Sequence, residues 1–347
     1  MSSKGVRVAV ASLGIVAMSV TGVGCSAFSL ITPEFDTSSL NETSVKLSMP
    51  KVNGDRPILT AAVTVGGGLE VPLLVDTGSP GVRVFASQVG SDVTRTDIPV
   101  DVTFADGTRF IGIEASAPIS FGGLTTKGPI TVQLITEVGC AEGKPTCVGA
   151  VGLEKFAAEQ PFDGLFGIGL QAASIYSPLS QLANGSPATF SVTADPGKAS
   201  GAITFNQRPT APAATFDMPA WAQPRMPNGY PAWASNQAQG CWSYGGQPAQ
   251  CLPTAFDTGS PTLFTDTSVP GVPTALGPVP TDTTIALAAT AGGAPVWSVR
   301  AGSTPGRNTV AVAPLDGGNN VNSGISLFRA KLVTFDAEHG KVLITDP

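Results

Sequence analysis

The chain has 347 residues, of which 42% are hydrophobic and only 13% charged, so it can bury a large core as one β domain or two lobes. A formal net charge of −6 without a basic cluster argues against a nucleic-acid partner, because phosphate binding needs concentrated Lys and Arg. With 41 Gly, 30 Pro and many short runs of Val, Ile and Thr, the sequence favours short strands joined by turns.

Residues 1–25 are predicted to be an export signal, in which two basic residues precede a short apolar stretch. A permanent transmembrane helix is the alternative, although the stretch is short for one. The end, Val23-Gly24-Cys25, resembles a bacterial lipobox that would make Cys25 the lipidated first mature residue. Gly22 departs from that pattern, so ordinary cleavage after Ala27 stays open. Either route exports the protein, which is then lipid-anchored on the outer face of the cell membrane or secreted.

Residues 26–52 are rich in Ser, Thr and Asn and are predicted to be a flexible tether. From Ile58 onward, apolar runs alternate with Gly-containing turns, which predicts a series of hairpins. Strands are expected at Ile58–Val65, Glu70–Val75, Val82–Phe85, Val100–Phe104, Phe110–Glu114 and Ile130–Ile135.

The middle of the chain contains an unusual glycine pattern. Phe162–Leu170 carries Gly at every second or third place, as in a strand that another backbone approaches closely. Pro209–Pro231 is predicted to be a long surface loop. The other expected elements are a short helix at Ser177–Ala183, a hairpin of Thr189–Val192 and Gly201–Phe205, and strands at Leu332–Phe335 and Lys341–Ile344.

One five-residue motif occurs twice. Asp76-Thr77-Gly78-Ser79-Pro80 recurs unchanged as Asp257-Thr258-Gly259-Ser260-Pro261, each time behind an apolar strand-like run. A single Asp-Thr-Gly is ordinary turn chemistry, since Asp accepts local backbone hydrogen bonds. An ionisable group at the point where a strand leaves a core costs free energy, however, unless the group is used. The repeat therefore predicts one site with two carboxylates, Asp76 and Asp257.

Two carboxylates that share a proton supply an acid and a base at once, because like charges in a dry site cannot both ionise cheaply. The ionised member can deprotonate a water while the protonated member donates to the carbonyl oxygen of an amide. This chemistry needs no metal and no cofactor. Hydroxyls can orient the carboxylates, and glycines allow the backbone to approach them. The residues expected to support the site are Thr77, Gly78, Ser79, Thr258, Gly259 and Ser260.

Five cysteines are present, and export or lipidation of Cys25 leaves four. We predict the local pairs Cys140–Cys147 and Cys241–Cys251, as expected in an oxidising compartment, with other pairings open. Zinc is the competing interpretation, but the chain has no Cys-x-x-Cys pair and a single histidine.

Other catalytic arrangements fit poorly. A Ser-His-Asp or Cys-His mechanism would have to use His339, whose surroundings are typical of an exposed turn. The Gly-x-Gly at Gly167–Gly169 lacks the strand-then-helix context of a dinucleotide site, and strand packing explains it better.

Several landmarks together resemble pepsin-like aspartic peptidases over nearly the whole mature chain. These are the spacing of the two Asp-Thr-Gly-Ser motifs, Phe162–Leu170, the hairpin of residues 189–205, and Thr334-Phe335-Asp336 followed by Lys341-Val342. The resemblance implies a mainly β, bilobal pepsin-like double-ψ β-barrel architecture with an active-site cleft between lobes 53–187 and 188–347. It also implies a flap hairpin over the substrate, which would carry Phe104, Ala105, Asp106 and Gly107.

The sequence departs from the family pattern at three places. Phe104 stands where a tyrosine is usual, and Arg83 stands where its tryptophan partner is expected. The second lobe's hydrophobic-hydrophobic-Gly segment is blurred to Val321-Asn322-Ser323-Gly324. These differences indicate a divergent bacterial branch.

The sequence thus predicts an exported, lipid-anchored or secreted aspartic endopeptidase that activates one water between Asp76 and Asp257. Its partner would be an extended polypeptide, an envelope or exported protein, and the enzyme would be a monomer. An inactive pepsin-like module that binds peptides or cell-wall material is the rival, motivated by Phe104 and Arg83. A β-rich surface adhesin is the third possibility, but it leaves the repeated motif unexplained.

Overall fold

A computed structural model describes residues 43–347 except 53–54, 196, 222–223, 303–309 and 316–317. The structure is mainly β because short runs alternate between buried apolar and more exposed residues, as in β4 (Thr60–Val65), where Ala61, Val63 and Val65 are fully buried. The predicted export signal and Cys25 lie outside the described residues. Within the described ranges, no helix is both long and apolar enough to cross a membrane.

The first group of strands contains the first Asp-Thr-Gly motif. Most of these strands form one end of a 15-stranded sheet, while β2 and β3 pair only with each other. The group consists of β2 (Lys51–Val52), β3 (Arg56–Pro57), β4, β5 (Glu70–Asp76), β6 (Pro80–Phe85), β7 (Thr94–Thr103), β8 (Thr108–Ala117), β9 (Ile119–Phe121), β10 (Leu124–Thr125), β11 (Ile130–Cys140) and β12 (Gly164–Ile168). Two short helical segments, η1 (Val148–Val151) and α1 (Leu153–Glu159), lie between β11 and β12, and a third, η2 (Pro178–Gln181), follows β12.

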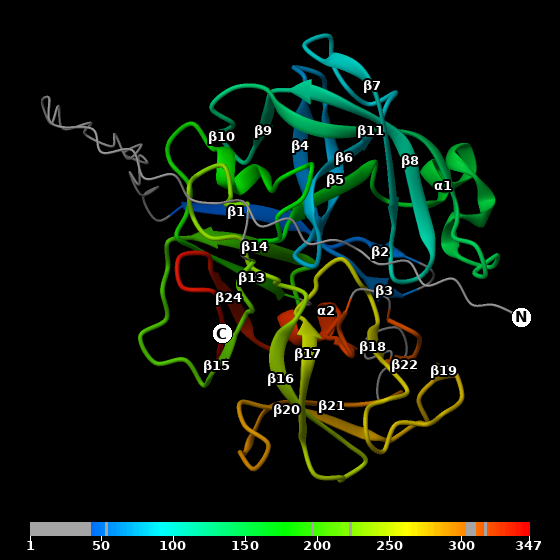
Figure 1. Cartoon of the computed structure of the whole chain (residues 1–347), viewed down its shortest axis with the longest axis vertical. Helices are drawn as coiled ribbons and strands as arrows, with labels where there is room; N and C mark the ends of the chain where they lie inside the picture. The colour runs from blue at the N-terminus through cyan, green and yellow to red at the C-terminus, as the bar shows by residue number, and fades with distance from the viewer. Residues whose placement is uncertain (1–42, 53–54, 196, 222–223, 303–309, 316–317) are drawn as a thin grey trace, which may run out of the picture. The chain divides into compact units, whose positions relative to one another are not determined.

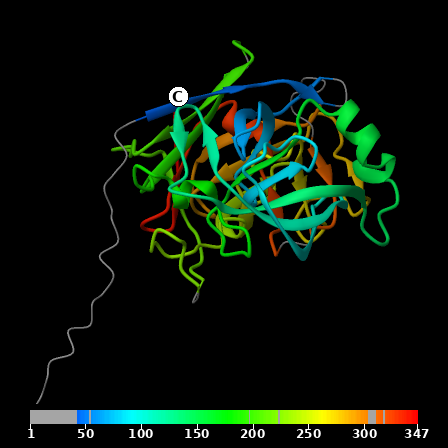
Figure 2. The same cartoon turned by 90° about the horizontal axis from the view of Figure 1, so that it is seen from above.

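A second group of strands, labelled between the others in Figure 1, continues the same sheet. It consists of β1 (Thr43–Ser48), β13 (Thr189–Asp195), β14 (Ser200–Phe205), β15 (Ala214–Asp217), β24 (Leu332–Asp336) and β25 (Lys341–Thr345). β1 joins this group to the first, because it pairs with β14 along its whole length and with β4 through Ser48 and Thr60. Figure 2 shows this N-terminal end of the described chain as a long blue strand.

The third group contains the second Asp-Thr-Gly motif and forms an eight-stranded sheet of its own. It consists of β16 (Ala238–Tyr244), β17 (Gln250–Ala255), β18 (Leu263–Thr265), β19 (Gly277–Pro278), β20 (Thr284–Ala288), β21 (Pro295–Arg300), β22 (Val310–Val312) and β23 (Val321–Asn322), followed by α2 (Ile325–Phe328).

Three predictions about elements need correction. Residues 43–52 of the predicted tether form β1 and β2, since Val45 and Leu47 alternate with exposed residues and are buried in the core. The predicted loop Pro209–Pro231 contains β15, whose buried Ala214 and Phe216 pair it with β25. The helix expected at Ser177–Ala183 is only the four-residue 3₁₀ turn η2.

The strands around the two motifs follow the same plan. β5 pairs in parallel with β12, and β12 pairs antiparallel with β6, the strand after the first motif. β17 likewise pairs in parallel with β23, and β23 pairs antiparallel with β18, the strand after the second motif. β6 and β18 each have a further parallel neighbour, β11 and β22. The sequence repeat therefore corresponds to a repeat in the structure.

Candidate active site

Both aspartates stand at the end of a buried strand. Asp76 is the last residue of β5, and Asp257 follows β17 by two residues. Both side chains are buried, with 6% and 8% of their surface exposed. The two carboxyl groups lie within hydrogen-bonding reach of each other. The structure therefore brings together two acids that are far apart in the sequence.

Four hydrogen bonds made by Thr77 and Thr258 join the two loops. Thr77 Oγ1 donates to the Phe256 carbonyl, and Thr258 Oγ1 donates to the Val75 carbonyl, both at 2.7 Å. Each hydroxyl also accepts from the backbone N–H of the other threonine, at 3.1 and 3.3 Å. Both side chains are fully buried, so removal of either hydroxyl would leave buried polar groups unpaired. The threonines hold the loops together, and in the described part of the chain their hydroxyls form these bonds and none to the carboxylates.

The glycines of the motifs allow each loop to approach the opposite carboxylate. A Cβ atom on Gly78 would lie 2.7 Å from Cγ of Asp257, and one on Gly259 would lie 2.7 Å from Cγ of Asp76. Such distances are impossible for a real side chain. Each glycine also donates its N–H to the carboxylate of its own loop, at 2.7 Å. Gly78 and Gly259 are therefore required by close approach, as the sequence predicts.

The outer oxygens of the two carboxylates have different partners. Ser79 donates its hydroxyl to Oδ2 of Asp76, and its N–H to Oδ1 at 3.0 Å. Ser260 instead donates its hydroxyl to the Thr262 carbonyl at 2.7 Å. On the second carboxylate, Nδ2 of Asn322 donates to Oδ2 of Asp257 at 2.7 Å. The expectation that Ser260 orients a carboxylate therefore needs correction, since its hydroxyl closes its own loop.

Asn322 is a site residue that sequence reasoning missed. In the register it lies opposite Ala255, two residues before Asp257, as Leu165 lies opposite Leu74, two residues before Asp76. The available signal was the polar residue in Val321-Asn322-Ser323-Gly324, where the pattern otherwise calls for a hydrophobic residue. The departure replaces an apolar contact with a hydrogen-bond donor to the site.

The surroundings of Asp76 favour its protonated form. Burial raises the pKa of Asp76 well above its usual range, and the charge of Asp257 raises it further. The hydrogen bonds from Ser79 and from the N–H of Gly78 act in the opposite direction, because they stabilise the carboxylate. The first two effects outweigh the others, so Asp76 holds a proton at a pH where an exposed aspartate has lost it.

Asp76 and Asp257 line one cavity of about 230 Å³. Phe104, Ala105 and Asp106, from the turn between β7 and β8, line the same cavity, and Gly107 completes that turn with a φ of +91°. The remaining lining is largely apolar and includes Leu74, Phe110, Phe156, Phe162 and Leu165. The turn predicted as a flap and both carboxylates thus line the same cavity. Asn322 and Ser260 also line this cavity.

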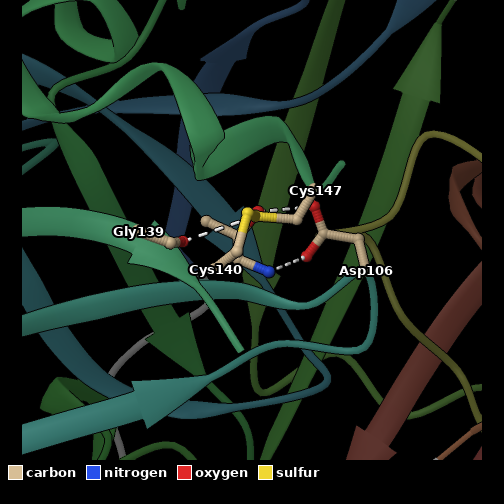
Figure 3. Close-up of a disulfide and its surroundings, with 5 residues drawn as sticks. Asp106, Gly139, Cys140 and Cys147 are labelled. Atoms are coloured by element: carbon tan, nitrogen blue, oxygen red, sulfur yellow. Dashed lines mark hydrogen bonds between the residues drawn. A yellow bond between two sulfur atoms is a disulfide. The ribbon is translucent and has the colours of Figure 1, made fainter. Parts of the chain in front are cut away.

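The four cysteines pair as predicted, Cys140 with Cys147 and Cys241 with Cys251. The first disulfide lies beside Asp106 of the β7–β8 turn (Figure 3). Asp106 is held by Thr108, which donates its N–H and its hydroxyl to the carboxylate at 2.9 and 2.7 Å. The second disulfide joins opposite residues of β16 and β17, the strand that precedes Asp257.

His339 lies outside this site, in the turn between β24 and β25. Its Nδ1 is 3.1 Å from both carboxylate oxygens of Asp336, and Arg208 forms an ion pair with the same carboxylate at 3.0 Å. The histidine is half exposed. It is a turn residue, in agreement with the simpler interpretation of the sequence.

Comparisons with known proteins place the fold. No family model and no curated protein sequence matches the chain. The structure is similar to the crystal structure of an aspartic proteinase from Irpex lacteus, with a TM-score of 0.54 and 14% sequence identity over 88% of this chain and 97% of that chain. A likeness at this identity concerns the fold alone. The chain thus has the mainly β, two-lobed fold of pepsin-like aspartic proteinases, as the sequence predicts.

Proposed function

We propose that this protein is an aspartic endopeptidase that hydrolyses peptide bonds with a water activated between Asp76 and Asp257. The observation that carries the proposal is the pair of buried carboxyl groups within hydrogen-bonding reach, held by two interlocked loops at one cavity. A binding protein gains nothing from two acids placed face to face, because their mutual repulsion costs stability.

In this proposal the two carboxyl groups share one proton, as is established for aspartic proteinases in general. Asp76, whose pKa is raised by burial and by its neighbour, donates to the carbonyl oxygen of the scissile amide. Asp257 accepts the proton of the attacking water, and its orientation is fixed by Asn322 and by the N–H of Gly259. The water oxygen bonds to the carbonyl carbon in this step. When the carbon–nitrogen bond then breaks, Asp257 gives its proton to the leaving nitrogen and Asp76 recovers a proton from the former carbonyl oxygen.

The proposed substrate is an extended polypeptide that lies across the cavity under the turn of Phe104–Gly107. The apolar lining of this cavity suits hydrophobic side chains on both sides of the scissile bond. The two disulfides support an oxidising compartment outside the cytoplasm. Envelope or exported proteins would then be the substrates, and lipidation at Cys25 would hold the enzyme at the membrane.

The test is cleavage of a diverse peptide mixture from acid to neutral pH, with products identified by mass spectrometry. We expect the mature protein to cleave and Asp76→Asn and Asp257→Asn to lose the activity. Asp217→Asn is the matched control, because that carboxylate is exposed and pairs with Lys341. No cleavage by any protein, or equal cleavage by all four, would exclude the enzyme.

The second candidate is an inactive module that binds peptides or cell-wall material. Phe104 favours it, because a phenylalanine in the flap turn covers the cavity without supplying a hydroxyl. Binding of uncleaved peptides by the wild type and by both Asp→Asn variants with equal affinity would support this candidate over the enzyme.

A further inference from the structure

A buried cation lies on β6, the strand that β12 separates from β5 and Asp76. Arg83, on β6, is only 5% exposed, and its Nη1 donates to Oε1 of Gln133 at 2.7 Å. Across the described ranges of the chain, its Nε has no hydrogen-bond partner. No carboxylate forms a direct ion pair with it in that part of the structure. Burying a guanidinium with so few partners costs free energy. An apolar side chain would fill the same place without this cost.

The structural repeat shows what the fold alone requires at this position. Arg83 pairs with Leu165 in the register of β6 and β12, and Phe264 pairs with Asn322 in the register of β18 and β23. Phe264 is therefore the counterpart of Arg83 in the other half. An apolar ring fills that place there, so packing does not demand a charge. Packing therefore does not explain why the residue at position 83 is charged.

The face of the sheet on which Arg83 lies is the face of the catalytic pair. Leu74 and Asp76 lie on one face of β5 because residues two apart share a face. Leu165 is opposite Leu74, and Arg83 is opposite Leu165, so the row continues across the three strands. In the other half, Asn322 holds the place of Leu165 and reaches Asp257 directly. The row that contains Arg83 therefore lies on the same face of the sheet as Asp76, two residues along β5 from it.

We propose that Arg83 is a positioning residue that acts through Asp76. Its fixed positive charge lowers the pH below which the singly ionised carboxyl pair takes up a second proton. Its contact with Gln133 couples this cation to the proposed flap. Nε2 of Gln133 donates to the carbonyls of Val100 on β7, at 3.1 Å, and Phe110 on β8, at 2.8 Å. The inference rests on the proposed function, since it concerns the same pair of acids.

The other charged groups near this row do not replace Asp76. Glu114 is opposite Gln133 on β8, Asp163 precedes β12, and Asp257 belongs to the other half. Burial lowers the pKa of Arg83 to about 10, and the charge of Asp76 acts in the opposite direction. Arg83 therefore stays charged at every pH at which the carboxyl pair titrates.

The first experiment is the pH profile of kcat/KM for the mature protein and three variants. Arg83→Gln removes the charge and keeps a polar side chain, and Arg83→Trp installs the residue expected from the family pattern. In both we expect the acidic and the alkaline limb to move upward by roughly half a pH unit or more, since a nearby cation favours the ionised carboxylate. Arg83→Lys should restore the profile at least in part, and Arg300→Gln, which removes an exposed charge from β21, should leave it unchanged.

The second experiment needs no activity and therefore separates this inference from the proposed function. Carbon-13 NMR of labelled Asp side chains follows the titration of Asp76 and Asp257 in the wild type and in Arg83→Gln or Arg83→Trp, whichever folds. We expect the titration of the pair to shift upward in the neutral variants. Unchanged titration, or an equal shift in Arg83→Lys, would overturn the role of Arg83 even in an active enzyme. A shift in a protein that cleaves nothing would keep this role and reject the peptidase.

Discussion

At the scale of single residues, identical motifs place their aspartates in different environments. Ser79 donates its hydroxyl to the outer oxygen of Asp76, whereas Asn322 donates to the outer oxygen of Asp257 from a strand that is remote in the sequence. The serine of the second motif, Ser260, bonds to Thr262 instead. The orientation of Asp257 therefore depends on the packing of β23, the strand that carries its donor. The orientation of Asp76 depends less on β12, because its donor belongs to its own loop.

The hydrogen bond from Asn322 to Asp257 should matter for catalysis. Replacement by Ala removes a bond to a charged group, which costs about 1.5–3 kcal/mol. If the bond is strongest in the transition state, Asn322→Ala lowers kcat by about 10–100-fold with little change in KM. Steady-state kinetics on a cleaved peptide measure both constants. Ser260→Ala is the control, because Ser260 makes no hydrogen bond to the carboxylate in the described part of the site; an equal loss of kcat in both variants would contradict the assignment.

Stability should depend on pH through Asp76. Folding raises the pKa of Asp76, so the folded state favours the protonated acid, and ionisation of this acid costs stability. The contribution of the protonated acid is complete below the unfolded pKa of about 3.9 and is lost as the pH rises through the folded value. Asp76→Asn cannot ionise. Its melting temperature should therefore exceed that of the wild type at neutral pH by a few degrees.

The gap between Asp76→Asn and the wild type should close toward pH 3, where the wild-type carboxyl is protonated. Thermal unfolding of the two proteins between pH 3 and 7 measures it. Asp217→Asn, which removes an exposed carboxylate, should show no such trend. A constant gap at all pH values would mean that the ionisation of Asp76 is not its cause.

At the scale of elements, the turn between β7 and β8 is fastened to the loop that Cys140–Cys147 closes. The N–H of Ala141 donates to the Gly107 carbonyl at 2.8 Å, and Nζ of Lys144 donates to the Ala105 carbonyl at 3.1 Å. The Lys144 side chain also covers Gly107, since a Cβ there would lie 2.6 Å from Cδ of Lys144. The disulfide next to this turn, drawn in Figure 3, thus restricts the residues that brace the proposed flap.

Removal of this disulfide should therefore affect substrate binding as well as stability. We expect Cys140→Ala/Cys147→Ala to lose about 2 kcal/mol of stability, because the cross-link closes a short loop, and to raise KM several-fold as the turn loosens. Cys241→Ala/Cys251→Ala is the matched control, with a similar loss of stability and an unchanged KM. Denaturant unfolding and peptide kinetics on both double variants test this. An equal rise of KM in both would show that the flap is not specifically braced.

At the scale of the whole described structure, β1 links two groups of strands that the sequence separates widely. It pairs along its length with β14 and meets β4 at Ser48. Val45 and Leu47 are buried in the large core, whereas Lys46 between them is exposed. Because β1 closes the gap between β14 and β4, it belongs to the fold itself and is not a tether.

A single charged residue on the buried face of β1 tests whether this strand contributes to the core. Leu47→Asp removes a buried leucine and places a carboxylate among apolar side chains, so we expect a loss of at least about 3 kcal/mol in the free energy of unfolding. Lys46→Asp places the same charge on the exposed face and should change stability by less than about 0.5 kcal/mol. Denaturant unfolding of both variants measures the difference. Similar stability of the two would mean that β1 contributes little to the core.

The features that the sequence predicted well are those that depend on residues close together in the chain. Apolar runs alternating with Gly-containing turns predicted the hairpins. The spacing of glycines predicted the close approach at Phe162–Leu170, where a Cβ on Gly167 would lie 2.6 Å from the Gly81 carbonyl. The weak alternation of residues 43–48 and 214–217 was missed, because Ser, Thr and Pro around it also suit a loop.

The sequence by itself singled out the two aspartates and the glycines that let their loops meet, since each belongs to a short repeated segment, and it favoured the two local cysteine pairs while leaving other pairings open. Only the tertiary structure decided which side chain orients Asp257, because Asn322 reaches it from a strand that no local pattern connects to the motif. It also decided that Arg83 is buried on the sheet face that carries Asp76. Such contacts depend on which strands become neighbours, and sheet order is fixed by packing over the whole chain.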